Sequence, residues 1–155
     1  MEKVILVDEN DNEIGTDEKM SVHKKGKLHR ALSVLVFNSR GDLLLQKRAA
    51  SKYHSGGLWA NTCCSHPREG EDVGTAAVRR LEEEMGFTCS LREIFHFIYR
   101  AKINDKITEH EFDHVFVGRF DGAPKPDTRE VQEWKWVSID ELRKDIKKNP
   151  NNYTS

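Results

Sequence analysis

The segment Trp59-Ala60-Asn61-Thr62-Cys63-Cys64-Ser65-His66-Pro67 brings an aromatic ring, two thiols and an imidazole together in one short stretch. A sequence rich in arginine and glutamate, with the pattern of a helix, follows it. A thiol and a histidine this close together, ahead of a helix that carries carboxylates, indicate a reaction centre. Free cysteines are also among the most buried residue types, so a buried strand end with two inert cysteines is the alternative.

The helix after this segment is expected to begin near Asp72 and to end before Gly86, which suits the left-handed position after a helix. Its apolar residues recur with helical spacing; they are Ala77, Val78, Leu81 and Met85. Two i,i+4 pairs support it, Arg79 with Glu83 and Arg80 with Glu84. Adjacent helical residues point about 100° apart, so one of Glu83 and Glu84 can be held by an arginine while the other faces a cleft. A solvated helix face is the alternative.

The rest of the chain predicts mainly strands. They are expected at Val4–Val7, Ala31–Phe37, Leu43–Arg48, Leu58–Cys64, Leu91–Ile103, Glu109–Phe120 and Val131–Val137. Thr16–Lys27 has no clear period and is expected to be a loop. A capping box at Ser138-Ile139-Asp140-Glu141 predicts a last helix that ends near Asn149-Pro150. Long strands in hairpins with a central and a late helix predict an α+β fold or an α/β/α sandwich with a mixed sheet.

Length and composition narrow the class of protein. The chain has 155 residues, which suits a single domain over 1–155. Its net charge of -1 gives no general attraction to nucleic acid. The chain contains no apolar run near the roughly 18 residues that cross a bilayer, and its start lacks the pattern of a secretory signal. Its 3 cysteines, two of them adjacent, make a disulfide framework unexpected and predict a cytoplasmic protein.

A metal site is indicated by Glu109-His110-Glu111. Side chains alternate along a strand, so Glu109 and Glu111 share one face and His110 points to the other. Two carboxylates in a largely buried sheet need cations, hydrogen bonds or a metal; solvent-facing glutamates are the alternative. With His23, His29 and His66 they would form a mixed nitrogen and oxygen set suited to Zn, Mn or Mg. We expect the remaining histidines to take no part; they are His54, His96 and His114.

The segment from Ser65 to Phe87 resembles the Nudix box, Gly-x5-Glu-x7-Arg-Glu-apolar-x-Glu-Glu-x-Gly-apolar. The matching residues are Glu71, Arg79, Leu81, Glu83, Glu84, Gly86 and Phe87. Two positions depart from the pattern: Ser65 replaces the first glycine and Arg80 replaces a glutamate. A lost helix carboxylate weakens the magnesium cluster that activates water in Nudix hydrolases, so these departures count against ordinary hydrolysis.

Nearly the whole chain resembles one branch of that superfamily, the type I isopentenyl diphosphate isomerases of isoprenoid biosynthesis. Asn61 to Pro67 is similar to the active-site cysteine motif of that family, and Tyr99-Arg100-Ala101 followed by Glu109-x-Glu111 is similar to its second motif. The resemblance implies a Nudix-like mixed sheet flanked by helices. It also implies the conversion of isopentenyl diphosphate to dimethylallyl diphosphate, an intramolecular oxidation and reduction that moves a C=C bond.

The resemblance further implies roles for individual residues. Proton transfer would fall to Cys64, Glu111 and Tyr99. A divalent metal (Mn, Zn or Mg) would be held by His23, His29, His66, Glu109 and Glu111. Glu84 would bind a Mg ion that meets the substrate diphosphate. The substrate would contact Lys19, Arg48, Lys52 and Arg80, with Trp59 as an apolar wall or, alternatively, as plain core packing.

Further expectations concern the C-terminal tail and the partners of the protein. The family continues into a C-terminal lid with an aromatic residue over the alkene. Here we expect that this tail is shorter, that Tyr153 substitutes for it in part, or that it is missing. We expect a small isoprenoid diphosphate as the substrate, no nucleic acid, no membrane insertion, and a monomer or weak dimer. A Nudix hydrolase and a non-catalytic diphosphate-binding relative are the alternatives.

Overall fold

Strand β3 (His29–Phe37) lies at the centre of a nine-stranded mixed sheet. It pairs in parallel with β8 (Thr108–Arg119), from His29 opposite Glu111 to Phe37 opposite Arg119. It also pairs antiparallel with β6 (Cys63–Ser65), where Ser33 lies opposite Cys64. The structure is a computed structural model that describes residues 2–52 and 54–154. The three central strands therefore bring residues from distant parts of the sequence onto one surface.

The other strands extend the sheet on both sides. They are β1 (Lys3–Val7), β2 (Glu13–Glu18), β4 (Leu43–Arg48), β5 (Trp59–Ala60), β7 (Leu91–Lys102) and β9 (Val131–Val137). The β1–β2 hairpin adds to β3, while β7 pairs antiparallel with β8. Both β5 and β9 pair antiparallel with β4.

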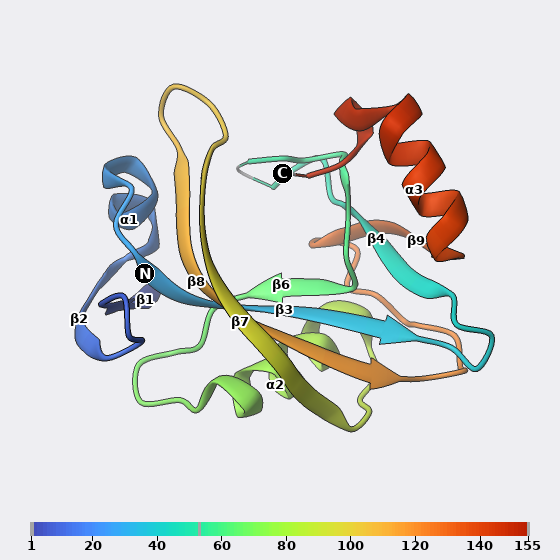
Figure 1. The fold of residues 1–155 in the computed structure, drawn as a ribbon, viewed down its shortest axis with the longest axis horizontal. Coiled ribbons are helices and arrows are strands. Elements are labelled where there is room, and N and C mark those ends of the chain that lie inside the picture. Colours follow the sequence, from blue (N-terminus) through green and yellow to red (C-terminus); the bar gives the residue numbers. More distant parts are fainter. Residues whose placement is uncertain (1, 53, 155) are drawn as a thin grey trace.

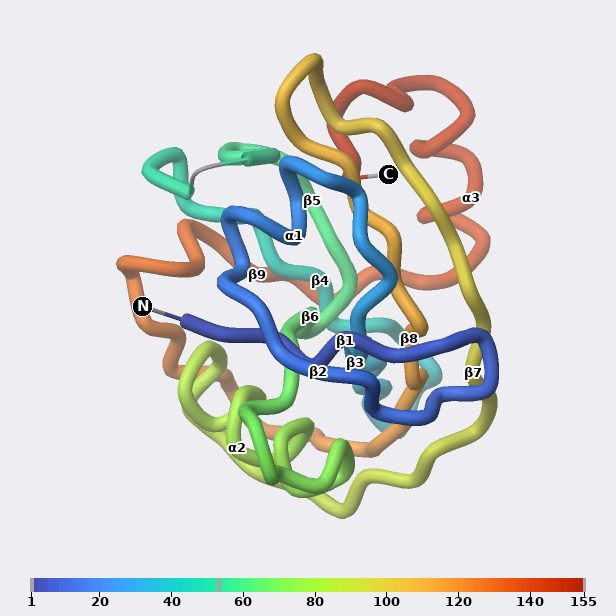
Figure 2. Tube along the Cα trace, turned by 90° about the vertical axis from the view of Figure 1, so that its left-hand side faces the viewer, coloured from blue at the N-terminus to red at the C-terminus, as the bar shows by residue number. Residues whose placement is uncertain are grey.

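Helices cover both faces of this sheet. They are α1 (Lys19–Lys25), α2 (Val73–Met85) and α3 (Ile139–Lys148), followed by the short 3₁₀ helix η1 (Pro150–Asn152). Figures 1 and 2 both place α2 on one side of the sheet and α1 and α3 on the other. The main core lies under α2, where Leu81 and Met85 pack with Val34 of β3 and Phe116 of β8. The layered arrangement confirms the predicted fold class.

The boundaries of α2 follow from its caps, as the sequence predicts. The Asp72 side chain accepts hydrogen bonds from the backbone N–H groups of Gly74 and Thr75, which satisfies free donors of the first turn. At the other end Gly86 has φ 73°, and Phe87 packs back into the core. The predicted cap of α3 is also present, because Ser138 accepts from the Glu141 N–H.

The prediction of a loop over Thr16–Lys27 is wrong. This segment contains the end of β2 and all of α1. The helix has 7 residues, of which only Val22 and His23 are buried. So short a helix with so narrow a buried face shows no periodicity in the sequence.

The single strand predicted at Leu58–Cys64 is two short strands, β5 and β6, separated by Asn61 and Thr62. At this break a side chain, that of Thr62, makes hydrogen bonds with backbone groups of the neighbouring strands. The Thr62 hydroxyl donates to the Leu44 carbonyl oxygen at 2.6 Å and accepts from the Val36 N–H at 3.0 Å. The break thus bridges β3 and β4.

The pairing between the consecutive strands β3 and β4 is limited to one residue pair, Phe37 opposite Leu43. Beyond it the two strands diverge, and β4 finds its long partner in β9. Among the described residues, no helix is long and apolar enough to cross a membrane.

Gly86→Ala is expected to destabilise the protein by roughly 3 kcal/mol, since a Cβ there would be strained at φ +73° and would lie 2.1 Å from the Lys125 carbonyl oxygen. Gly41→Ala is the matched control, with φ +80° and no atom within 4 Å of the added Cβ. Its cost should be about 1 kcal/mol, from backbone strain alone. Urea denaturation of both variants measures the difference, and equal losses would contradict the packing argument.

Candidate active site

Three histidines and a glutamate meet at one end of the central strands. Ligand atoms of His23, His29, His66 and Glu109 all lie within 4.8 Å of one another. They come from α1, from the start of β3, from the residue after β6 and from β8. The cluster can bind a metal ion, and its composition of imidazole and carboxylate suits a divalent transition metal.

Glu111 adjoins this cluster. Its Oε2 lies 3.2 Å from His66 Nε2 and 3.4 Å from His29 Nε2, while Glu109 Oε1 lies 2.9 Å from His23 Nε2. The Tyr99 hydroxyl donates a hydrogen bond to the other oxygen, Glu111 Oε1, because the β7–β8 register sets Tyr99 opposite Glu111. The alternation predicted for this strand is present.

The tautomer of His29 fits a metal ligand. Its Nδ1 lies 3.0 Å from the Lys27 carbonyl oxygen, an acceptor, so Nδ1 carries the hydrogen and Nε2 has a free lone pair. That Nε2 is buried and makes no hydrogen bond. A buried lone pair aimed at the carboxylates, with the opposite ring nitrogen held by a backbone carbonyl, is the usual arrangement of a metal-binding histidine.

The pKa shifts of Glu109 and His66 favour the forms that bind a metal, whereas those of Glu111 and His29 favour the protonated forms. Burial would lower the pKa of His29, but the hydrogen bond and charge of Glu111 raise it. Burial by itself would raise the pKa of Glu109, but hydrogen bonds from His23 and His54 outweigh it and hold that pKa well below its usual range. Burial and the neighbouring cationic groups lower the pKa of His66. Burial and the charge of Glu109 raise the pKa of Glu111, although His29 opposes them. An ionised carboxylate and neutral imidazoles are the forms that bind metals.

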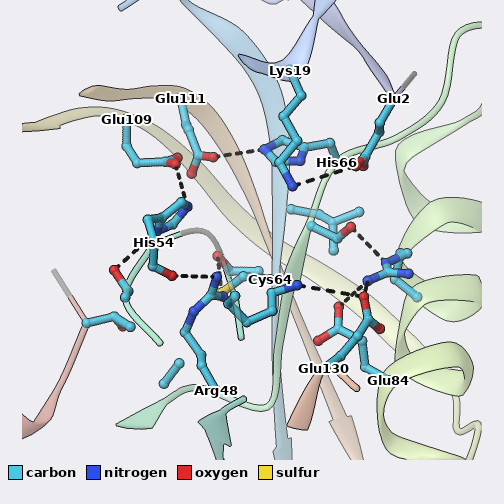
Figure 3. A pocket seen from close by; sticks show the side chains of 18 of the residues that line it. Glu2, Lys19, Arg48, His54, Cys64, His66, Glu84, Glu109, Glu111 and Glu130 are labelled. Atoms are coloured by element: carbon cyan, nitrogen blue, oxygen red, sulfur yellow. Dashed lines mark hydrogen bonds and ion pairs between the residues drawn. The ribbon is translucent and has the colours of Figure 1, made fainter. Parts of the chain in front are cut away.

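A cavity of about 330 Å³ opens beside the cluster, and Cys64 and Glu111 both line it. Figure 3 shows Glu109 and Glu111 on one side of this cavity and Glu84 and Glu130 on the other. Cys64 is exposed to the cavity yet closely surrounded by protein. This burial, together with the charges of Asp113 and Glu111, raises the pKa of the Cys64 thiol to about 12. The group is therefore a neutral thiol.

Four cations predicted to bind substrate line the same cavity; they are Lys19, Arg48, Lys52 and Arg80. Trp59 is different. It is absent from the described lining residues, and its ring lies 4.2 Å from Lys135 Nζ. The structure contradicts the idea that Trp59 forms a wall of the cavity.

Arg80 is held by three carboxylates. Its guanidinium lies 2.6 Å from Glu83 Oε1, 2.7 Å from Glu84 Oε2 and 2.9 Å from Glu130 Oε1. Glu84 also accepts from Gln46 Nε2 at 3.0 Å, which fixes it at the cavity wall. Arg79 makes a bidentate pair with Glu71 at 2.8 and 2.9 Å, which ties the preceding loop to α2.

A NUDIX domain family profile matches residues 27–155. The chain is 56% identical to isopentenyl-diphosphate Delta-isomerase 1 and 54% identical to isopentenyl-diphosphate Delta-isomerase 2, both of Aromatoleum aromaticum. Each match covers 99% of this chain and 86% or 81% of the relative. The chain belongs to the isopentenyl-diphosphate Delta-isomerase family of Nudix proteins. The predicted family is thereby confirmed.

Solved structures support the Nudix fold of this isomerase family member. The crystal structure of DR0079 from Deinococcus radiodurans has a TM-score of 0.80 at 19% identity, covering 96% of this chain and 90% of that chain. The MutT protein from Methanosarcina mazei has a TM-score of 0.64 at 20% identity, covering 74% and 80%. At these identities the likeness concerns the fold alone.

The two departures from the Nudix box contact each other. Ser65 Oγ accepts a hydrogen bond from Arg80 Nε at 2.9 Å. A glycine at position 65 would offer no side-chain acceptor there. In this isomerase family member the serine and the arginine thus form one local unit between β6 and α2.

Several cavity residues were missed by sequence reasoning. Gln46, Glu130 and Ser33 line the cavity, and Glu130 Oε1 lies 3.7 Å from Lys52 Nζ. None stands in a motif, and only the fold brings them to the site. Tyr153, expected as a partial lid, instead donates its hydroxyl to Asp145 of α3, while its neighbour Thr154 lines the cavity.

The prediction that His54 takes no part is wrong. His54 Nε2 lies 3.3 Å from Glu109 Oε1, and its ring centroid is 5.8 Å from that of His23. His54 sits in the loop between β4 and β5, so no spacing in the sequence links it to β8. His110 Nδ1 contacts the Gly26 carbonyl oxygen, and His96 is largely exposed.

Because His54 holds an oxygen of Glu109, His54→Ala should weaken metal binding about tenfold. Isothermal titration of the metal-free protein with Zn²⁺ or Mn²⁺ measures the affinity. The matched control is His96→Ala, whose side chain is 59% exposed and pairs with Glu93, so affinity should not change. Equal affinities for the two variants would contradict a role for His54.

Proposed function

We propose that this protein isomerises isopentenyl diphosphate to dimethylallyl diphosphate inside the cavity that Cys64 and Glu111 share. The observation that carries the proposal is that one cavity is lined by a neutral thiol and by a carboxyl group hydrogen-bonded to Tyr99. This cavity lies beside a cluster that can bind a metal. The activity named for the relatives at 54 and 56% identity supports the same conclusion.

The reaction needs a proton added to one carbon of an unactivated alkene and a proton removed from another. We assign these transfers to Cys64 and to Glu111, with Tyr99 holding the Glu111 carboxyl in place. A thiol that stays neutral is inexpensive to bury, so the cavity can remain apolar where the alkene lies. A carbocation-like intermediate would be captured by water, so the site must exclude it.

The metal would be held by His23, His29, His66, Glu109 and Glu111. We propose Zn, Mn or Mg as the ion, since the mixed donor set accepts each of them. When bound, the ion would supply a fixed positive charge beside the Glu111 carboxyl. In the protein itself, Tyr99 and the β8 backbone orient that carboxyl toward the cavity.

The diphosphate would bind among Lys19, Arg48, Lys52 and Arg80, which all line the cavity. Burial and Arg48 lower the pKa of Lys52, although Glu130 opposes this. The negative charge of a bound diphosphate would therefore stabilise the protonated form of Lys52. We assign Glu84 to a Mg ion that travels with the diphosphate. Trp59 is left out of this assignment because it does not face the cavity.

Hydrolysis, the general Nudix activity, fits the site less well. It needs helix carboxylates that hold metal and activate water. Here Arg80 replaces one glutamate of the Nudix box, and Glu83 is bound by Arg79 and Arg80. We propose one domain over 1–155 with a monomeric or weakly dimeric state, and the cytoplasmic location stays a prediction.

Cys64→Ala should reduce isomerisation about a thousandfold because the proton donor or acceptor at one face of the alkene is lost. Binding of the diphosphate should persist. The measurement is NMR of isopentenyl diphosphate in deuterated water, which follows both the double bond and the incorporation of label. Cys63→Ala is the control: its thiol is fully buried and is absent from the described lining of the cavity, so its turnover should stay near wild type. Full turnover by Cys64→Ala would rule out this cysteine's role.

Glu111→Gln should lose turnover and metal affinity together. An amide cannot take up the proton, and it is a weaker ligand than a carboxylate. The same NMR assay and a calorimetric metal titration report the two losses separately. A variant that bound metal and turned over substrate like wild type would contradict the assignment of Glu111.

A further inference from the structure

We propose that Asn61 is a positioning residue for this reaction: its side-chain oxygen fixes the direction of the Cys64 thiol hydrogen. The inference rests on the proposed function, because it concerns the proton that Cys64 exchanges with substrate. Asn61 itself is absent from the described lining of the cavity, so it would act through the thiol.

The orientation of the Asn61 amide is decided by its other contacts. Its Nδ2 donates to the Val34 carbonyl oxygen at 3.0 Å and to the Cys63 carbonyl oxygen at 3.1 Å. Both partners are backbone acceptors, so the NH₂ group must face them. The flipped amide would set an oxygen against two carbonyl oxygens. The side-chain oxygen therefore faces Cys64.

The thiol is consequently the donor in its contact with Asn61. Cys64 Sγ lies 2.9 Å from Asn61 Oδ1, and an amide oxygen only accepts. Rotation about the Cβ–Sγ bond of an exposed cysteine is otherwise free, and a fixed acceptor selects one direction for the hydrogen. Such preorganisation of a reacting group is worth a large factor in rate.

Ser33 completes the surroundings of the sulfur. Its hydroxyl donates to Asp113 Oδ2 at 2.7 Å, so the lone pairs of Ser33 Oγ remain for Cys64 Sγ at 3.9 Å. The β3–β6 register sets Ser33 directly opposite Cys64. The single thiol hydrogen therefore goes to Asn61 Oδ1, and Ser33 Oγ is a more distant, weaker acceptor.

The direct test is the S–H stretching band of Cys64, identified as the band that disappears in Cys64→Ala. In the wild-type protein it should lie below the frequency of a free thiol, because the hydrogen is bonded to Asn61. In Asn61→Ala it should move to higher frequency. A wild-type band at the free-thiol position, or a band that Asn61→Ala leaves unmoved, would overturn the proposal.

Kinetics provide a second readout. For folded Asn61→Ala, kcat should fall at least tenfold while KM changes less than twofold, since Asn61 does not touch substrate. Ser33→Ala should lower kcat by a smaller factor. Ser33→Thr keeps the hydroxyl, so its kcat should stay near the wild-type value. An unchanged kcat, or a rise in KM alone, would overturn the assignment.

Asn38→Ala is the matched control for a purely structural effect. Asn38 is buried and absent from the described lining of the cavity, and its side chain accepts from the backbone N–H groups of Arg40 and Asp42. It should lower the melting temperature without moving the S–H band. The wild-type band is measured without substrate and, once assigned with Cys64→Ala, does not depend on Asn61→Ala being stable. If wild-type protein fails to isomerise isopentenyl diphosphate, the proposed function fails while the band still decides the role of Asn61.

Discussion

The parallel register between β3 and β8 is the constraint on which the site depends. It sets His29 beside Glu111, and the β6 strand on the opposite edge of β3 then sets Cys64 beside Ser33. Side chains alternate along each strand, so one face of β3 supplies Leu32 and Val34 to the core under α2 while the other supplies the site. A slip of one residue would exchange these faces, sending polar groups into the core. The hydrophobic core and the catalytic geometry are therefore specified by the same pairing.

Buried charge is the second constraint. Glu109 and Glu111 are 7% exposed each, and Asp113 is 4% exposed, all on one face of β8. Burial and the neighbouring Glu111 raise the pKa of Asp113 to about 7, although its bond from Ser33 opposes this. So many carboxyl groups in a small volume are stable only with cations or shared protons close by. The imidazoles of α1, β3 and the loop after β6 contact these carboxyl groups. A bound divalent ion would add the positive charge that compensates for the buried carboxylates.

The sequence predicts those parts of the site that depend on local periodicity. The common face of Glu109 and Glu111 follows from strand alternation, and the caps at Asp72 and Gly86 follow from helix geometry. His54, Glu130 and Ser33 reach the cavity only through tertiary folding, which no spacing along the chain reveals. The helix α1 was missed because its buried face is two residues wide. Trp59 was misplaced because its partners, Lys47 and Lys135, lie on neighbouring strands of the same sheet.

The relation between Ser65 and Arg80 bears on how a hydrolase scaffold comes to support isomerisation. Taken one at a time, a serine for the opening glycine and an arginine for a glutamate look like two losses. In the fold they bind each other at 2.9 Å, and the arginine also draws Glu83, Glu84 and Glu130 together. Carboxylates bound in this way are poor candidates for ordering an attacking water. A reaction that passes through a carbocation has the opposite requirement to hydrolysis, since water near the alkene ends it. Arg80 replaces one metal-binding glutamate and binds the neighbouring glutamates, so the site is less able to activate water. The same arginine keeps a positive group where a diphosphate would bind.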